Sequence, residues 1–116
     1  MGERILVIDD EALILSSIER ALSKVGYEIT AVKELEDFRN AIISGNFALI
    51  ITDLHMEGIN TDRLILEAKS RIPEIKVLTI SGSVGAEDSK YFLQKPFRIS
   101  SLREKVREIL NEPSRD

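Results

Sequence analysis

The sequence lacks cysteine and tryptophan, and only 5% of its 116 residues are aromatic. Without cysteine the chain can form neither disulfides nor a thiolate metal site, and this fits a reducing compartment. Acidic residues outnumber basic residues by 20 to 16, so no basic excess is available for nucleic acid. No apolar run reaches the roughly 20 residues of a membrane-spanning helix. We therefore expect one cytoplasmic domain over residues 1–116, with no nucleic acid or membrane partner.

What the sequence does contain is a regular alternation of two kinds of segment. Short runs rich in isoleucine and valine occupy residues 4–10, 28–32, 47–54, 76–80 and 91–93. Continuous hydrophobicity of this kind is typical of strands covered on both faces, as in a parallel sheet. Between the runs, apolar residues recur at three- and four-residue steps: Leu15, Ile18 and Leu22; Phe38 and Ile42; Leu64 and Ala68; Leu102, Val106 and Ile109. Strands that alternate with amphipathic helices predict a doubly wound α/β fold.

Three features predict where helices end or begin. Gly26 and Gly45 follow the first two helical segments, and glycine commonly ends a helix. Ser101 and Glu104 have the spacing of a capping box. This spacing predicts that the last helix begins directly after Ser101.

Polar residues follow the apolar runs at positions where strands should end: Asp9, Asp10, Glu11, Asp53, Ser81 and Lys95. In doubly wound sheets, ligands bind beyond the carboxyl ends of the strands. Each residue alone is better explained as a cap, a turn or a solvated charge. Clustered carboxylates, however, repel one another and destabilise the fold unless a positive group joins them. The whole set therefore predicts a ligand site.

The chemistry of these side chains favours phosphoryl transfer. Mg²⁺ prefers oxygen ligands, and a lysine ammonium suits a phosphoryl oxygen. A phosphoryl group would thus lie between Mg²⁺ and Lys95, with a hydrogen bond from Ser81. Asp53 is the candidate nucleophile because it stands alone, whereas Asp9 and Asp10 form a pair suited to a metal.

Four motifs, in this order, resemble the receiver domain of two-component response regulators over essentially the whole chain. They are VIDDE at 7–11, ITDLHMEGIN at 51–60, LTISG at 78–82 and FLQKPF at 92–97. The resemblance implies a flavodoxin-like fold with five parallel strands in the order 2-1-3-4-5 and helices on both faces. It also implies a single receiver domain that acts in signalling and catalyses only its own phosphorylation and dephosphorylation.

The resemblance further assigns roles around Asp53, which would accept a phosphoryl group from a sensor histidine kinase. Asp10 would bind Mg²⁺ directly and Asp9 mainly through water. Asp53 and the backbone carbonyl of His55 would complete the protein ligands. The His55 imidazole would either shield the phosphoryl group or be solvated, and we favour solvation.

The remaining assignments concern the last strand. Ser81 and Lys95 would hold the phosphoryl oxygens, and the Lys95–Pro96 bond is often cis in the family. Phe92 matches the aromatic residue whose rotamer reports phosphorylation. The sequence leaves open whether Phe92 is instead an ordinary core residue.

The chain departs from the family pattern in three places. Glu57 stands where a proline is common, and Thr61 stands where a glycine is usual; we expect both to change the loop and leave the chemistry intact. The link over 82–90 has no apolar stripe and is too short for the usual fourth helix. We predict a mobile loop or a single helical turn around 86–89.

Several classes of function remain open at this point. We favour a signalling domain without an effector domain, a monomer, whose partners are a kinase and a phosphotransfer protein or downstream target. A phosphatase of the haloacid dehalogenase type would place both aspartates after the first strand in the spacing D-x-D. A flavodoxin-like cofactor protein would need a phosphate loop there, where Asp9, Asp10 and Glu11 would repel phosphate. A pseudo-receiver would bind partners without phosphorylation.

Overall fold

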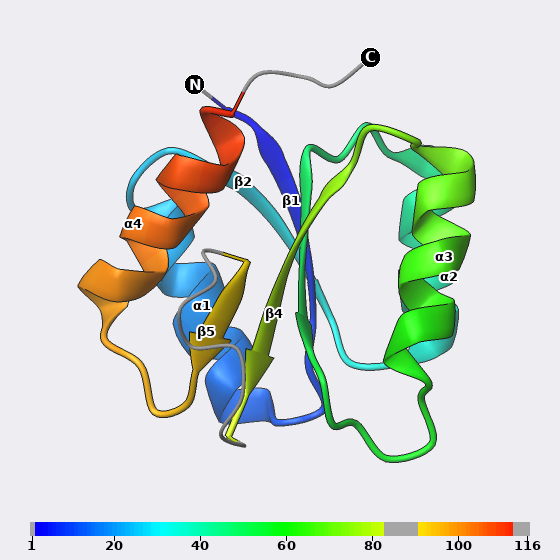
Figure 1. The fold of residues 1–116 in the computed structure, drawn as a ribbon, viewed down its shortest axis with the longest axis horizontal. Helices are drawn as coiled ribbons and strands as arrows, with labels where there is room; N and C mark the ends of the chain where they lie inside the picture. Colours follow the sequence, from blue (N-terminus) through cyan, green and yellow to red (C-terminus); the bar gives the residue numbers. More distant parts are fainter. Residues whose placement is uncertain (1, 83–90, 113–116) are drawn as a thin grey trace.

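A computed structural model of the chain describes residues 2–82 and 91–112. Five strands form one parallel sheet in the order β2-β1-β3-β4-β5, which confirms the predicted topology (Figure 1). The strands are β1 Arg4–Ile8, β2 Glu28–Val32, β3 Leu49–Asp53, β4 Lys76–Ser81 and β5 Phe92–Gln94. The helices within the described residues are α1 Ala12–Ser23, α2 Leu35–Ser44, α3 Thr61–Arg71 and α4 Ile99–Leu110.

The sheet separates two helical layers, with α1 and α4 on one face and α2 and α3 on the other (Figure 1). Alternate residues of β1 enter different cores: Ile5 and Val7 join the α1–α4 core, whereas Leu6 and Ile8 join the α2–α3 core. Each core also contains the apolar residues predicted from the helical spacing. Burial on both sides therefore explains why the strand sequences are apolar throughout.

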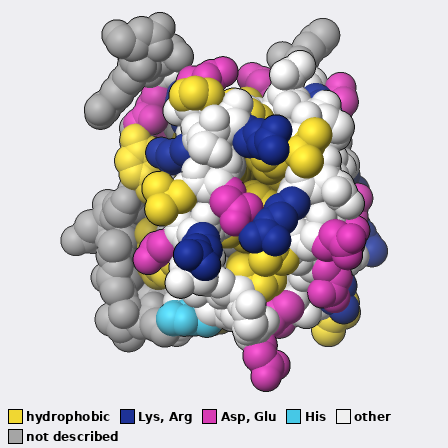
Figure 2. All heavy atoms as spheres, turned by 90° about the vertical axis from the view of Figure 1, so that its right-hand side faces the viewer, with side chains coloured by type: hydrophobic (Ala, Val, Ile, Leu, Met, Phe, Trp, Pro, Cys, Tyr) yellow, Lys and Arg dark blue, Asp and Glu magenta, His cyan; other side chains and the backbone are white. Residues whose placement is uncertain are grey.

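The outer surface of the α2–α3 layer mixes acidic, basic and apolar side chains (Figure 2). An exposed ion pair joins the two helices, with Arg39 Nε and Nη2 donating to the two carboxylate oxygens of Glu67 at 2.9 and 2.8 Å. Arg39 and Glu67 thus form a one-to-one ion pair on this surface.

Gly26 ends α1 as predicted. Its φ of +99° lies in the left-handed region that glycine adopts at no steric cost. The Gly26 N–H donates to the Ser23 carbonyl at 3.1 Å, and the Tyr27 N–H donates to the Leu22 carbonyl at 3.3 Å. These two bonds are the Schellman pattern, which satisfies carbonyls at the end of the helix.

Gly45 follows α2 for a different reason. Its backbone is extended, with φ −110°, so no left-handed conformation requires glycine here. A Cβ at this position would lie 2.2 Å from the Phe47 ring. Gly45 is therefore needed to make room for Phe47, which is buried in the α2–α3 core.

The predicted start of the last helix is wrong. Helix α4 begins at Ile99, with Arg98 as its N-cap, and no side chain caps it. The Leu102 N–H donates to the Arg98 carbonyl at 3.0 Å, so Ser101 already lies within the first turn. The fully buried Leu102 is thereby held inside the helix and against the core, which outweighs the local preference of a capping box.

The connection between β4 and β5 contains residues 83–90, which lie outside the described residues. The predicted loop or single turn around 86–89 falls there and stays a prediction. Over the described parts of the chain, no helix is both long and apolar enough to span a membrane.

Candidate phosphoacceptor site

The carboxyl edge of the sheet brings the predicted site residues together. The loop after β1 supplies Asp9, Asp10 and Glu11, and β3 ends at Asp53. One carboxylate oxygen from each of these four residues lies within 4.8 Å of the others. Like charges at such distances repel one another, and positive groups at this edge would stabilise the four carboxylates.

Asp53 is fixed from two directions. It is the last residue of β3 and only 3% exposed. Its Oδ1 accepts a hydrogen bond from the His55 N–H at 3.0 Å, and its Oδ2 accepts one from Lys95 Nζ at 2.8 Å. The carboxylate is therefore held by one backbone amide and one ammonium group.

Lys95 supplies the positive charge of the site. Its Nζ also donates to Glu11 Oε2 at 3.2 Å and lies 3.6 Å from Asp9 Oδ2. Burial lowers the pKa of Lys95, but the hydrogen bond to Asp53 and the charges of Asp9 and Asp53 outweigh it, so the pKa is raised. The side chain consequently remains an ammonium group, shared among three acidic residues.

The backbone next to Lys95 connects it to the neighbouring strand. Its N–H donates to the Ser81 carbonyl at 2.8 Å, and the Lys95–Pro96 peptide bond is cis, as the resemblance implied. Ser81 ends β4 and is buried. Phe92 begins β5 and is also buried. The structure thus places Ser81 and Lys95 at adjoining strand ends.

Asp9 has the most unfavourable surroundings of the four acids. It is 1% exposed, and its Oδ1 accepts from the Glu11 N–H at 2.9 Å. Its Oδ2 is buried and has no hydrogen-bond partner. Burial raises the pKa of Asp9, although the Glu11 N–H and the charge of Lys95 oppose the shift.

The donor set fits a hard divalent cation. Carboxylate oxygens are the ligands that Mg²⁺ prefers, and the buried Oδ2 of Asp9 lacks a partner that such an ion would supply. Asp10 is exposed, and its Oδ2 accepts from the Glu57 N–H at 3.3 Å. His55, two residues after Asp53, is exposed as well.

Two residues of the site received no specific role from the sequence. Glu11 was placed at the strand end with Asp9 and Asp10, but its share in Lys95 was not foreseen. The hydroxyl of Thr61 donates to the carbonyls of Asp53 and Leu54, each at 3.2 Å. The replacement of the family's glycine by Thr61 was the available signal, but its bonding partners depend on the folded loop.

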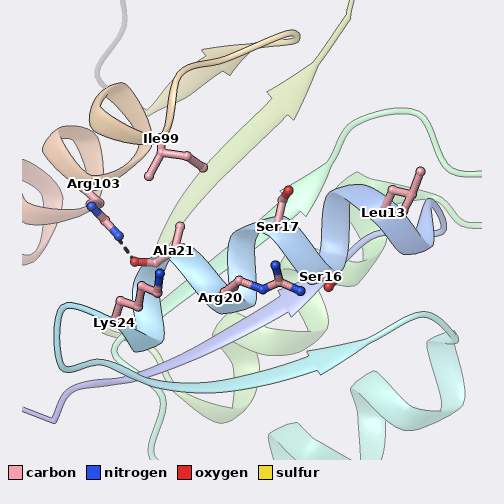
Figure 3. A pocket seen from close by; sticks show the side chains of 8 residues that line it. All are labelled: Leu13, Ser16, Ser17, Arg20, Ala21, Lys24, Ile99 and Arg103. Atoms are coloured by element: carbon pink, nitrogen blue, oxygen red, sulfur yellow. Dashed lines mark hydrogen bonds between the residues drawn. The ribbon is translucent and has the colours of Figure 1, made fainter.

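A groove of about 400 Å³ lies beside the site, between α1 and α4 (Figure 3). Its wall includes Leu13, which is 85% exposed, and Ile99. Three cationic side chains also line it: Arg20, Lys24 and Arg103. Arg103 Nε donates to the Ala21 carbonyl at 2.9 Å, the bond that is dashed in Figure 3.

The family model of the response regulator receiver domain matches residues 5–107. The chain belongs to this family. The receiver domain is 30% identical to the DNA-binding transcriptional regulator NtrC of Rhizobium meliloti, over 98% of this chain and 25% of the relative. It spans 49% and 54% of two other curated relatives.

Solved receiver structures have the same fold. A CheY-like receiver domain protein from Methanospirillum hungatei is 25% identical, with a TM-score of 0.83 over 96% of this chain and 95% of that one. The response regulator TrrA from Thermotoga maritima, in complex with Mg²⁺-BeF, is 27% identical, with a TM-score of 0.78 over 92% and 98%. TrrA in complex with the histidine kinase ThkA is 28% identical, with a TM-score of 0.78 over 94% and 99%.

Proposed function

We propose that Asp53 accepts a phosphoryl group from a phosphohistidine of a sensor histidine kinase, in a reaction that requires Mg²⁺. The observation that carries the proposal is the position of the Asp53 carboxylate. Lys95 Nζ lies 2.8 Å from one of its oxygens, and Asp9, whose buried Oδ2 has no hydrogen-bond partner, belongs to the same cluster. A nucleophile between an ammonium group and an oxygen-rich cation site suits phosphoryl transfer.

In the proposed step, a carboxylate oxygen of Asp53 forms a bond to phosphorus. The bond between phosphorus and the donor's imidazole nitrogen breaks, and that nitrogen keeps the electron pair and takes a proton from solvent. Lys95 moves its hydrogen bond from Asp53 to a phosphoryl oxygen, and the Ser81 hydroxyl donates to another.

Mg²⁺ would be held by Asp10 directly, by Asp9 mainly through water, by Asp53 and by the carbonyl of His55. When bound, the ion supplies positive charge that neutralises the phosphoryl oxygens during transfer. The TrrA structure in complex with Mg²⁺-BeF supports Mg²⁺ as the ion by similarity.

We propose that the kinase docks over the groove between α1 and α4. The complex of TrrA with ThkA supports a kinase partner by similarity. Leu13 offers an exposed apolar contact next to the site. Arg20 and Lys24 form no ion pair with any described residue, so they favour a partner helix that carries acidic residues.

The decisive experiment is incubation with Mg²⁺ and acetyl phosphate, followed by intact-mass measurement. We expect the wild type to gain the mass of one phosphoryl group and Asp53→Asn to gain none. Asp37→Asn, an exposed aspartate in the first turn of α2, is the matched control and should react as the wild type. Lack of reaction in the wild type, or equal reaction in Asp53→Asn, would refute the acceptor assignment.

The docking surface has a separate test with a panel of purified histidine kinases. We expect any kinase that phosphorylates the wild type to transfer at least about tenfold more slowly to the Arg20→Glu/Lys24→Glu variant. The rate with acetyl phosphate should not change. Equal kinase rates for both proteins would contradict docking at this groove.

The other functional classes are not favoured by the family match. Turnover of a generic phosphate ester would revive the phosphatase interpretation. Partner binding that is the same with and without acetyl phosphate would point to a pseudo-receiver. Four further points stay predictions: the role of Phe92 as a switch, the phosphotransfer or downstream partner, the monomeric state and the cytoplasmic location.

A further inference from the structure

The hydroxyl group of Thr61 joins helix α3 to the backbone of the acceptor. Thr61 is the first residue of α3 and only 7% exposed. Its Oγ1 lies 3.2 Å from the Asp53 carbonyl oxygen and 3.2 Å from the Leu54 carbonyl oxygen. A hydroxyl has one proton to donate, so the two consecutive carbonyls share it.

These carbonyls lie where the sheet stops providing partners. The pairing of β3 with β1 ends at Thr52, and its pairing with β4 ends at Asp53. The Asp53 carbonyl also accepts from Thr52 Oγ1 at 3.0 Å. No other described residue donates to the Leu54 carbonyl. The Leu54 N–H still donates to the Ile80 carbonyl of β4 at 2.9 Å, which orients the Asp53–Leu54 peptide unit. Thr61 therefore acts mainly on the next peptide unit, through the Leu54 carbonyl.

The same short segment holds the Asp53 carboxylate. The peptide unit after Leu54 carries the His55 N–H, which donates to Asp53 Oδ1 at 3.0 Å. Rotation of the Leu54 carbonyl would turn this N–H away, because both belong to one planar peptide unit. The His55 carbonyl, one residue further, would move as well.

Helix α3 gives Thr61 a rigid base. Asn60 caps the helix, with its side-chain oxygen accepting from the Arg63 N–H at 3.0 Å. Leu64 and Ala68 are buried in the α2–α3 core. The hydroxyl thus links the backbone of residues 53–54 to a helix that is fixed by its buried face.

We propose that Thr61 is a positioning residue, which holds the 53–55 backbone so that the Asp53 carboxylate and the His55 carbonyl face the transferred phosphoryl group and its metal. This inference rests on the proposed function, and it gives a role to a position where the family usually has glycine. Thr61 touches no reacting atom, and it acts only through the backbone.

The test compares three variants. Thr61→Val keeps the shape of the side chain and removes the hydroxyl, whereas Thr61→Ser keeps the hydroxyl. Thr79→Val is the matched control, because Thr79 Oγ1 also donates to a carbonyl, that of Tyr91, at 3.2 Å. We expect Thr61→Val to accept phosphoryl from acetyl phosphate about tenfold more slowly, since small misplacements of reacting groups carry large rate costs. Thr61→Ser and Thr79→Val should stay within about twofold of the wild type.

A second readout does not depend on phosphorylation. In amide hydrogen exchange, the His55 N–H should lose protection in Thr61→Val and keep it in Thr61→Ser. If the wild type accepts no phosphoryl group, the proposed function fails, and the exchange data alone decide whether Thr61 positions this backbone. A folded Thr61→Val with unchanged His55 protection and an unchanged rate would overturn the inference.

Discussion

The two ion-paired regions of this receiver domain differ in balance. On the α2–α3 surface, Arg39 and Glu67 pair one to one through two hydrogen bonds and remain exposed. At the carboxyl edge, one ammonium group serves three carboxylates, and the buried Oδ2 of Asp9 is left without a hydrogen bond. Positive and negative charge balance in the first pair, whereas the second region has an excess of buried negative charge.

This difference separates a stabilising contact from a functional one. Exposed pairs add little stability, because water screens both charges. Buried charges without full compensation cost stability, and folds tolerate them where a ligand or a reaction uses them. The four predictions below test this distinction, in order of decreasing expected effect.

The largest effect should follow the loss of the shared cation. In the absence of Mg²⁺, Lys95→Ala should lower the free energy of unfolding by about 3 kcal/mol, because buried carboxylates lose their partner. Urea denaturation measures this change. Lys69→Ala, an exposed lysine on α3, should change stability by less than about 0.5 kcal/mol. Similar losses in both variants would show that a lysine at the carboxyl edge contributes no more to the free energy of unfolding than a surface lysine does.

Mg²⁺ should stabilise the protein through the same edge. At a concentration one hundred times its Kd, the ion should raise the free energy of unfolding by about 2.7 kcal/mol. Asp9→Asn should lose most of this gain, and Glu67→Gln should keep all of it. Denaturation midpoints with Mg²⁺ and with EDTA provide the measurement. A gain that survives in Asp9→Asn would remove Asp9 from the ion's surroundings.

Neutralising Asp9 should stabilise the metal-free protein. Asp9→Asn should raise the free energy of unfolding in EDTA by about 1–2 kcal/mol, because a buried charge is removed. The pKa of Asp9 is raised above its ordinary value of 3.8 in the folded state, so the folded protein binds this proton more readily than the unfolded chain. The contribution of Asp9 to stability should therefore increase as the pH falls through the raised pKa towards 3.8, so the wild type should gain stability relative to Asp9→Asn over this range. A wild type and an Asp9→Asn variant with parallel pH profiles would contradict this.

The smallest effect is expected at the balanced pair. Arg39 holds the pKa of Glu67 below its ordinary value of 4.5, so the pair contributes stability above pH 4.5 that is lost as the pH falls through the lowered pKa. Glu67→Gln should remove this pH dependence, with a change in denaturation midpoint near the limit of detection. A double-mutant cycle with Arg39→Gln measures the coupling. Coupling as large as the effect of Lys95→Ala would erase the contrast between the two regions.

The fold could be predicted because its signals are local and repeated. The spacing of Leu15, Ile18 and Leu22 predicts a helix face whatever lies opposite, and all three residues are buried. The helix end at Gly26 could also be predicted, because the preference of glycine for the end of a helix is local. The start of α4 could not, because the burial of Leu102 against the α1–α4 core competes with the capping signal at Ser101.

The sequence predicts which residues form the site, but not which of them form hydrogen bonds with one another. Parallel strands bring their carboxyl ends to one edge, so the meeting of Asp9, Asp53 and Lys95 follows from topology. The contact between Glu11 and Lys95 spans 84 positions of the chain and depends on side-chain reach. The bonds of Thr61 depend on the path of the loop after Asp53. Such contacts leave no periodic trace in the sequence.

The hydrogen bond from the Glu57 N–H to Asp10 Oδ2 has a spectroscopic consequence. A proline, common at this position in the family, has no N–H and could not make it. In this chain, therefore, the Glu57 amide proton is hydrogen-bonded to the Asp10 carboxylate, which is proposed to bind Mg²⁺. Its resonance in a ¹⁵N-edited spectrum should shift as the ion is added, which gives the carboxyl edge a backbone signal of its own without an introduced fluorophore.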